Sequence, residues 1–227
     1  MAIKPILMNT EMVRAILDGR KNCIRRVIKH NTEAVLNSTY HMEHPEIEDA
    51  WLIRRLCRAP YDPGDVLYVR ETWDCYPEYE DENAPAIYYY KADGDLRPEG
   101  YREIGWLSPI HMPKEAARIW LKVTDVRVER LQDITEDEAK AEGMPDSLDY
   151  PVDKAYCPLC KGEGIIGTVD VHSLGHMDVD CPYCDSYRKR FENLWNSINQ
   201  KCLDRYGWDS NPFVWVIEFD RCETPKG

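Results

Sequence analysis

The most constraining feature of this 227-residue sequence is a set of two CxxC pairs in its second half. CPLC contains Cys157 and Cys160, CPYC contains Cys181 and Cys184, and twenty residues separate the two pairs. Two intervening residues let both sulfurs of a pair face one metal, and four thiolates form a closed tetrahedral zinc site. A redox-active CxxC would normally occur as a single pair near a βαβ unit. We therefore expect a structural zinc ion held by these four cysteines.

The chain is acidic, but its charge is unevenly spread. Lys and Arg number 29 against 41 Asp and Glu, which gives a formal net charge of −12. This balance argues against a general binder of the nucleic-acid backbone, whose affinity comes from neutralising phosphates. However, Val13–His30 has six basic residues and one acid, whereas Glu129–Asp149 has eight acids and two basic residues. We expect a small anion-facing site rather than a basic surface.

Length and apolar runs set the expected organisation. The length suits one large domain or one domain with an insertion. We expect a main body over residues 1–150 plus 186–227 and a zinc-binding insertion over residues 151–185. No apolar run approaches the roughly 18 residues of a membrane span, and Met1–Thr10 lacks the apolar stretch of a signal peptide. A cytosolic protein with no membrane partner is therefore expected.

Hydrophobic patterns predict a mixture of strands and helices. The expected strands are Pro5–Asn9, Cys23–Ile28, Val66–Arg70, Ala86–Lys91, Ala117–Leu131 and Phe213–Phe219. The expected helices are Glu11–Asp18, a short helix starting at the Thr135–Glu138 capping box, and Ser186–Leu203. Asn31–Ala50 has no clear period and is interpreted as an irregular loop. Because strands and crossover helices do not alternate, this order favours an α+β fold, a small and mostly antiparallel barrel with flanking helices.

Two further motifs resemble a known family. Gly19–Arg26 is GRKNCIRR and Gly64–Trp73 is GDVLYVRETW. Together they resemble the ASCH domain, whose pattern is Gly-x-Lys-x-x-Thr-x-Arg, an excursion, a Gly-Asp turn and a strand ending in Glu. Longer stretches, from PILMNTEMVRAILDGRKNCIRRVIK to the tail NPFVWVIEF, are similar to ASCH-domain proteins of tailed phages and prophages. The resemblance implies a PUA-like β-barrel with a zinc-ribbon-like insertion, located in the cytoplasm of a bacterial host.

The resemblance also implies positions for catalysis. In family members that remove the acyl group from N4-acetylcytidine, a Lys, a Thr and a Glu act together, and these correspond here to Lys21, Ile24 and Glu71. Ile24 has no hydroxyl, so that nucleophile is absent. Cys23 cannot replace it, because neighbouring side chains on a strand point to opposite faces. Lys21 and Glu71 remain the catalytic candidates, with water as the nucleophile they would polarise.

A wider set of residues is expected to contact the ligand. The set is Gly19, Arg20, Lys21, Arg26, Glu71 and His111. The basic members offer contacts to anions or base edges, and Glu71 can accept hydrogen bonds from an exocyclic amine such as that of cytosine. Two structural alternatives stand beside this interpretation. Lys21 or Arg26 could form an ion pair with Glu71 that only stabilises the barrel. His111 could serve only to anchor its proline-bounded loop.

Three functions follow as hypotheses. The first is binding of a nucleobase, nucleotide or short RNA or DNA element, single-stranded or structured, in the barrel cleft. The second is a hydrolase that uses Lys21 and Glu71, either an acyl-nucleoside amidohydrolase or a nuclease. The third is a phage assembly or interaction protein that contacts a protein partner through the zinc knuckle. The acidic net charge favours small ligands or local single-strand contacts over long duplexes.

Overall fold

The computed structural model describes residues 1–30, 32–77, 86–102, 105–145, 160, 165–169, 175–181 and 186–225. The chain forms two compact units. Unit 1 consists of Met1–Gly19, Tyr61–Asp125 and Glu218–Gly227, and unit 2 consists of Arg20–Pro60 and Val126–Ile217. The division separates Lys21, in unit 2, from Glu71, in unit 1, and each is described below with its own partners.

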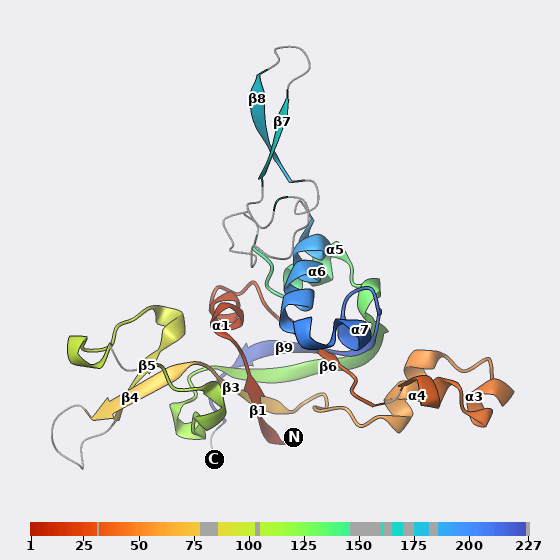
Figure 1. Cartoon of the computed structure of the whole chain (residues 1–227). Helices are drawn as coiled ribbons and strands as arrows, with labels where there is room; N and C mark the ends of the chain where they lie inside the picture. Colours follow the sequence, from red (N-terminus) through yellow and green to blue (C-terminus); the bar gives the residue numbers. More distant parts are fainter. Residues whose placement is uncertain are drawn as a thin grey trace. The chain divides into compact units, whose positions relative to one another are not determined.

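A five-stranded sheet is the main β element. Its order is β1 (Ile3–Leu7), β3 (Val66–Arg70), β6 (Trp120–Arg130), β9 (Phe213–Cys222) and β2 (Cys23–Val27), and Figure 1 shows β6 beside β9. β1 runs parallel to β3, whereas β3 runs antiparallel to β6 with Val66 opposite Lys122. Within the described residues β1 and β2 are outer strands, so the sheet is open. The predicted α+β class is confirmed, while the closed barrel stays a prediction.

Unit 1 adds a helix, a hairpin and short 3-10 turns to its strands. Helix α1 (Thr10–Leu17) ends at Gly19, whose φ of +75° is readily adopted by glycine at a helix end. β4 (Trp73–Pro77) pairs antiparallel with β5 (Ala86–Tyr90). The 3-10 turns are η1 (Lys91–Asp93), η2 (Glu99–Tyr101), η3 (Pro109–His111) and η4 (Lys114–Ala116). A small core of Trp73, Met112 and Ala116 lies under these turns.

Unit 2 contains most of the helices. They are α2 (Thr32–Leu36), α3 (Thr39–Glu43), α4 (Asp49–Leu56), α5 (Glu136–Ala141), α6 (Tyr187–Ile198) and α7 (Leu203–Tyr206), with 3-10 turns η5 (Leu131–Asp133) and η6 (Gln200–Cys202). The hairpin of β7 (Ile165–Val169) and β8 (His176–Asp180) is a separate two-stranded sheet. The prediction of an irregular loop over Asn31–Ala50 is wrong, because α2, α3 and the start of α4 lie there. The five-residue helices α2 and α3 are too short to establish a hydrophobic period.

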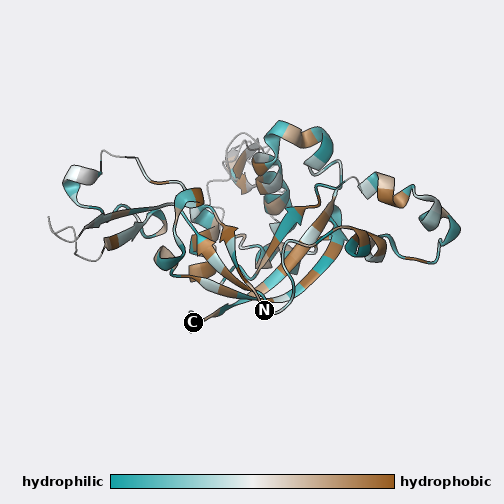
Figure 2. Ribbon diagram, turned by 90° about the horizontal axis from the view of Figure 1, so that it is seen from below, coloured by the Kyte–Doolittle hydropathy of each residue, from teal (hydrophilic) through white to brown (hydrophobic). Residues whose placement is uncertain are grey.

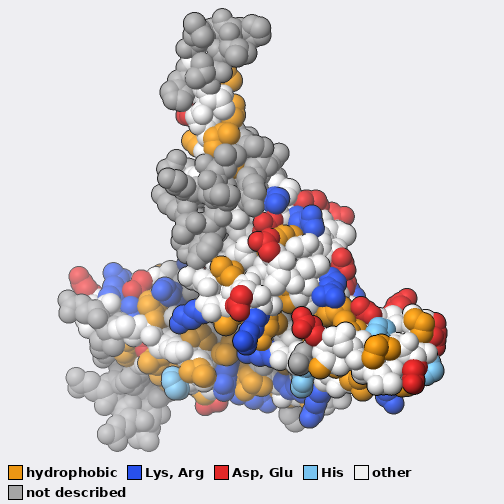
Figure 3. Space-filling view, turned by 45° about the vertical axis from the view of Figure 1, so that its right-hand side comes forward, with side chains coloured by type: hydrophobic (Ala, Val, Ile, Leu, Met, Phe, Trp, Pro, Cys, Tyr) orange, Lys and Arg blue, Asp and Glu red, His pale blue; other side chains and the backbone are white. Residues whose placement is uncertain are grey.

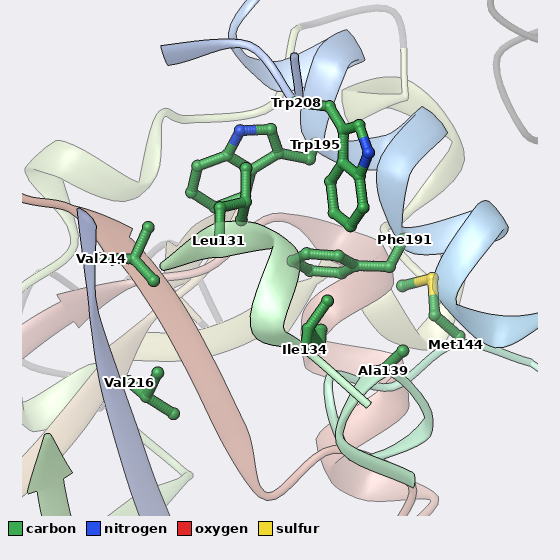
Figure 4. Packing of buried hydrophobic residues seen from close by; sticks show 9 residues of the cluster. All are labelled: Leu131, Ile134, Ala139, Met144, Phe191, Trp195, Trp208, Val214 and Val216. Atoms are coloured by element: carbon green, nitrogen blue, oxygen red, sulfur yellow. The ribbon is translucent and has the colours of Figure 1, made fainter. Parts of the chain in front are cut away.

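The core of unit 2 is aromatic and lies between α6, α5 and β9 (Figure 4). Its members are Leu131, Ile134, Ala139, Met144, Phe191, Trp195, Trp208, Val214 and Val216. The Phe191 ring lies 5.8 Å from that of Trp195 and 6.4 Å from that of Trp208. Trp195 Nε1 donates a 2.6 Å hydrogen bond to the Tyr206 carbonyl, so its polar atom is satisfied inside the core.

The strands bury hydrophobic side chains and expose hydrophilic ones. Hydrophobic and hydrophilic residues alternate along the strands (Figure 2). In β6 the alternation buries Leu121 and Val123 in the first part and Val126 and Val128 in the second, with a shift of one residue between them. On the face seen in Figure 3, acidic and basic side chains are interspersed. Among the described residues, none of the helices combines the length and apolar character needed to cross a bilayer.

Candidate functional site

The first charged cluster, in unit 2, is built around Lys21. Its ammonium group donates to Glu142 Oε2 at 2.7 Å and to the Glu142 carbonyl at 2.8 Å, and the Lys21 side chain is only 1% exposed. Asn22 N also donates to the Ala141 carbonyl at 3.0 Å. Side-chain and backbone contacts together hold the basic turn against the end of α5.

Arg25 extends this cluster along the strand. Because side chains two residues apart share a face of an extended chain, Lys21, Cys23 and Arg25 lie on one side. The guanidinium of Arg25, which is 0% exposed, lies 3.4 Å from Glu142 Oε1 and 3.2 Å from both Glu129 Oε2 and Glu138 Oε2. Three carboxylates therefore surround two buried cations.

Helix α5 positions two of those carboxylates. Thr135 and Glu138 form a reciprocal capping box at its start, as predicted, and Gly143 ends it with a φ of +94°. The pKa of Glu138 is lowered: burial would raise it, but the Thr135 amide, Arg25 and Arg127 outweigh burial. Glu138 therefore remains ionised beside Arg25 and Arg127.

The second charged cluster, in unit 1, is built around Glu71. Arg118 donates through Nε and one terminal nitrogen to the two Glu71 carboxylate oxygens, at 2.9 and 3.0 Å. Its other terminal nitrogen donates to Asp93 Oδ2 at 2.6 Å, and the guanidinium lies 4.0 Å from the centroid of the Tyr90 ring. The Tyr90 hydroxyl donates to the Ala116 carbonyl at 2.7 Å. Glu71 is buried, whereas the Arg118 side chain is 25% exposed.

Burial governs the titration of this second cluster. It raises the pKa of Glu71, and the hydrogen bond and charge of Arg118 offset only part of that rise. Burial also raises the pKa of Tyr90 to about 12. For Arg118, burial would lower the pKa, but hydrogen bonds to Glu71 and Asp93 keep it above its usual value. Arg118 is therefore a permanent cation, and Tyr90 stays protonated at neutral pH.

The remaining predicted cleft residues differ in their surroundings. Gly19 terminates α1, and Arg20 donates to the Gly143 carbonyl at 2.6 Å. Arg26 and His111 are exposed, the latter on η3. Ile24 is buried, which agrees with a packing role. The structure thus brings Arg20 and Lys21 together at the end of α5.

Sequence reasoning missed the partners that give both clusters their chemistry. Lys21 is paired with Glu142 and Glu71 with Arg118, instead of the pairing of Lys21 with Glu71 that was considered as a structural alternative. The opposite charges of Val13–His30 and Glu129–Asp149 were the available signal for the first pair. Nothing comparable marks Arg118, which lies just before β6 among apolar residues.

The structure describes two of the four cysteines that are predicted to bind zinc. Cys157 and Cys184 lie outside the described residues, whereas Cys160 and Cys181 are both buried. Ile165 pairs with Asp180, so Cys181, which follows Asp180 directly, lies at the open end of the β7–β8 hairpin. Within the described ranges, no group of three or more His, Cys, Asp or Glu residues is placed to hold a metal. The four-cysteine zinc site therefore stays a prediction.

Comparison with models of protein families, with curated proteins and with solved structures gave no match. The chemistry of the two charged clusters is therefore the basis for assigning a function.

Proposed function

We propose that this chain is a PUA-like, ASCH-type protein of phage or prophage origin that binds a nucleobase, nucleotide or short nucleic-acid element. The observation that carries the proposal is the pairing of Arg118 with Asp93 beside Tyr90. Both charged side chains are partly exposed and lie 2.6 Å apart, so a donor group and an acceptor group stand side by side.

This pairing suits the edge of a base. A guanidinium has five N–H groups, and the contacts with Glu71 and Asp93 use three of them, leaving two for a ligand. Asp93 can accept from an exocyclic amine while Arg118 donates to a neighbouring ring nitrogen or carbonyl. Two carboxylates and one guanidinium carry a net negative charge, which disfavours a phosphate at this position.

The same contacts favour binding over catalysis. Lys21 is enclosed by the Glu142 carboxylate and carbonyl, and Glu71 is held in a two-point contact by Arg118. Lys21 is poorly placed to activate water, because its side chain is only 1% exposed and its ammonium group already donates to Glu142. Ile24 adds no hydroxyl. The residues that the resemblance implicates in catalysis are thus better suited to stabilise the fold of the unit in which each lies.

Binding is tested with a panel of nucleosides, nucleotides and short oligonucleotides, followed by calorimetry. Cytidine and adenosine, which carry an exocyclic amine, are expected to bind more tightly than uridine. Asp93→Asn should reduce this preference. Arg118→Lys keeps the positive charge but removes the planar set of guanidinium N–H donors, and it should weaken binding about tenfold or more. Arg205→Lys is the matched control, because Arg205 is exposed on α7. Absence of any binding, or binding indifferent to both variants, would refute the proposal.

Hydrolysis is a second candidate, favoured by the raised pKa of Glu71. A buried carboxyl whose pKa is raised is better suited to proton transfer than an ordinary surface carboxyl. The wild type is expected to hydrolyse N4-acetylcytidine slowly or not at all, and Ile24→Thr is the informative reversal. Robust wild-type turnover that Glu71→Gln abolishes would select the hydrolase instead.

The proposal includes a structural zinc ion in the segment that contains the four cysteines. Cys157, Cys160, Cys181 and Cys184 would hold it, and the ion would fix the base of the β7–β8 hairpin. A two-stranded hairpin alone is marginally stable in water, so a metal cross-link at its open end supplies the missing stability.

A further inference from the structure

Helix α4 presents an aromatic side chain and two arginines to solvent. Trp51 is 54% exposed, and Arg54 and Arg55 are exposed three and four residues later. On a helix these spacings place side chains on one face. Arg58, also exposed, follows just beyond the end of the helix. We refer to Trp51, Arg54, Arg55 and Arg58 as the α4 face.

The arginines of the α4 face have no carboxylate partner in the part of the chain that the structure describes. Other arginines are strongly paired: Arg25, Arg97, Arg118 and Arg127 each contact two or more carboxylates. Ion pairing with the acidic residues that the structure describes therefore does not explain these three neighbouring arginines. Their positive charge is available to an external anion.

The opposite side of α4 is fixed in the protein. Leu52 and Ile53 are buried, and α2 packs against α4. His41 Nε2 lies 2.9 Å from Asp49 Oδ1, which connects α3 to the first turn of α4. Figure 1 shows these two helices side by side. The exposed arginines and Trp51 are therefore displayed from an anchored helix, which limits the entropy lost on binding.

We propose that the α4 face binds single-stranded nucleic acid, with the arginines on the phosphodiester backbone and Trp51 stacked on a base. Arginine forks match phosphate oxygens, and an exposed indole offers a stacking surface that any base can use. The sequence analysis expected a small anion-facing site rather than a basic surface. The α4 face would be a second location at which this chain binds an anion. The inference rests on the proposed function in assigning a nucleic-acid ligand, but it uses different residues.

Charge complementarity favours this occupant over others. An acidic peptide would satisfy the arginines but gives Trp51 no stacking partner. Long duplexes are opposed by the net charge of −12. With three arginines, the salt dependence of binding should correspond to about three phosphates, a slope near −2 in the logarithm of affinity against the logarithm of salt concentration for a single strand.

The test is fluorescence anisotropy with labelled single-stranded RNA and DNA of about 12 nucleotides, in separate titrations. Arg54→Glu combined with Arg55→Glu should weaken binding of whichever strand binds by about tenfold or more and flatten the salt slope. Trp51→Ala should weaken it by about tenfold. The matched control is Lys201→Glu with Arg205→Glu, the same charge change at exposed sites of unit 2, and it should have a much smaller effect. All five residues changed in these variants are exposed, so unchanged thermal midpoints verify folding.

Three results would overturn the inference. One is absence of oligonucleotide binding by the wild type, and another is an equal loss in the control. The third is an acidic peptide that competes at the same concentration as the oligonucleotide. Cytidine binding measured in the same variants separates this inference from the proposed function. If cytidine binds and the α4 variants leave oligonucleotide affinity unchanged, only the α4 face is wrong. If the α4 variants act but Arg118→Lys affects no ligand, only the proposed base site is wrong.

Discussion

Lys21 and Glu142 form a buried ion pair with their charged atoms 2.7 Å apart, although 121 residues separate them in the sequence. The contact joins the first residues of unit 2 to the C-terminal end of α5. Removing one partner of a buried pair leaves an uncompensated charge, which costs far more than the pair contributes. Substitutions at Lys21 thus affect stability as well as any binding.

Glu142→Ala is predicted to destabilise the protein by about 3–5 kcal/mol, because it leaves Lys21 and part of Arg25 without a counter-charge. The double variant Lys21→Met with Glu142→Leu should recover most of this loss, since it removes both charges. Urea denaturation measures both. Asp137→Ala is a control on the same helix, since Asp137 is exposed. A loss below about 1 kcal/mol for Glu142→Ala would contradict the prediction.

Arg118→Met is predicted to destabilise the protein in a pH-dependent way. Without Arg118, the buried Glu71 carboxyl loses the group that lowers its pKa, so its pKa rises further above the ordinary value of 4.5. A carboxyl with a raised folded-state pKa contributes most favourably at low pH, and this contribution is lost as pH rises through that pKa.

The cost of Arg118→Met should therefore be larger at about pH 8 than at about pH 5, reaching about 3 kcal/mol at the higher pH. Denaturation at both values is the measurement. Adding Glu71→Leu should remove the pH dependence. A cost that is the same at both values would show that Glu71 is not the titrating group.

Asp65 is predicted to contribute to acid sensitivity. Burial would raise its pKa, but Lys4 at 2.6 Å and the amides of Ala2 and Asp62 lower it from 3.8 to about 2. A depressed folded-state pKa stabilises the protein above the unfolded value, and the benefit is lost as pH falls toward the folded value. The stability difference between wild type and Asp65→Asn should shrink as pH falls from about 4 to about 2. A constant difference over that range would exclude Asp65 as the cause.

One zinc ion per chain is predicted for protein purified without chelator. Elemental analysis should find it, and Cys181→Ser should abolish it, because three remaining thiolates no longer close the tetrahedron. Cys202→Ser is the control, since Cys202 is exposed and lies outside both CxxC pairs. Folded protein that is free of metal from the start would disprove the site.

Features with short-range causes were predictable from the sequence. The strand at Val66–Arg70 has the predicted bounds, because a Pro-Gly turn precedes an unbroken β-prone run. The capping box at Thr135 is confirmed, since both of its hydrogen bonds join residues three positions apart. The same local rules were insufficient for 32–56, where three short helices depend on packing more than on a visible period.

The sequence alone therefore determined where local chemistry is decisive: helix caps, turns, the alternation of strands and the spacing of the CxxC pairs. Only the tertiary structure decided which acidic and basic side chains form ion pairs. It placed Arg25 beside Lys21 and Glu142, paired Glu71 with Arg118, and left the arginines of the α4 face without a described partner. The reason is physical: a hydrogen bond within a turn depends on a few neighbouring residues, whereas an ion pair across 121 residues depends on how the whole chain packs.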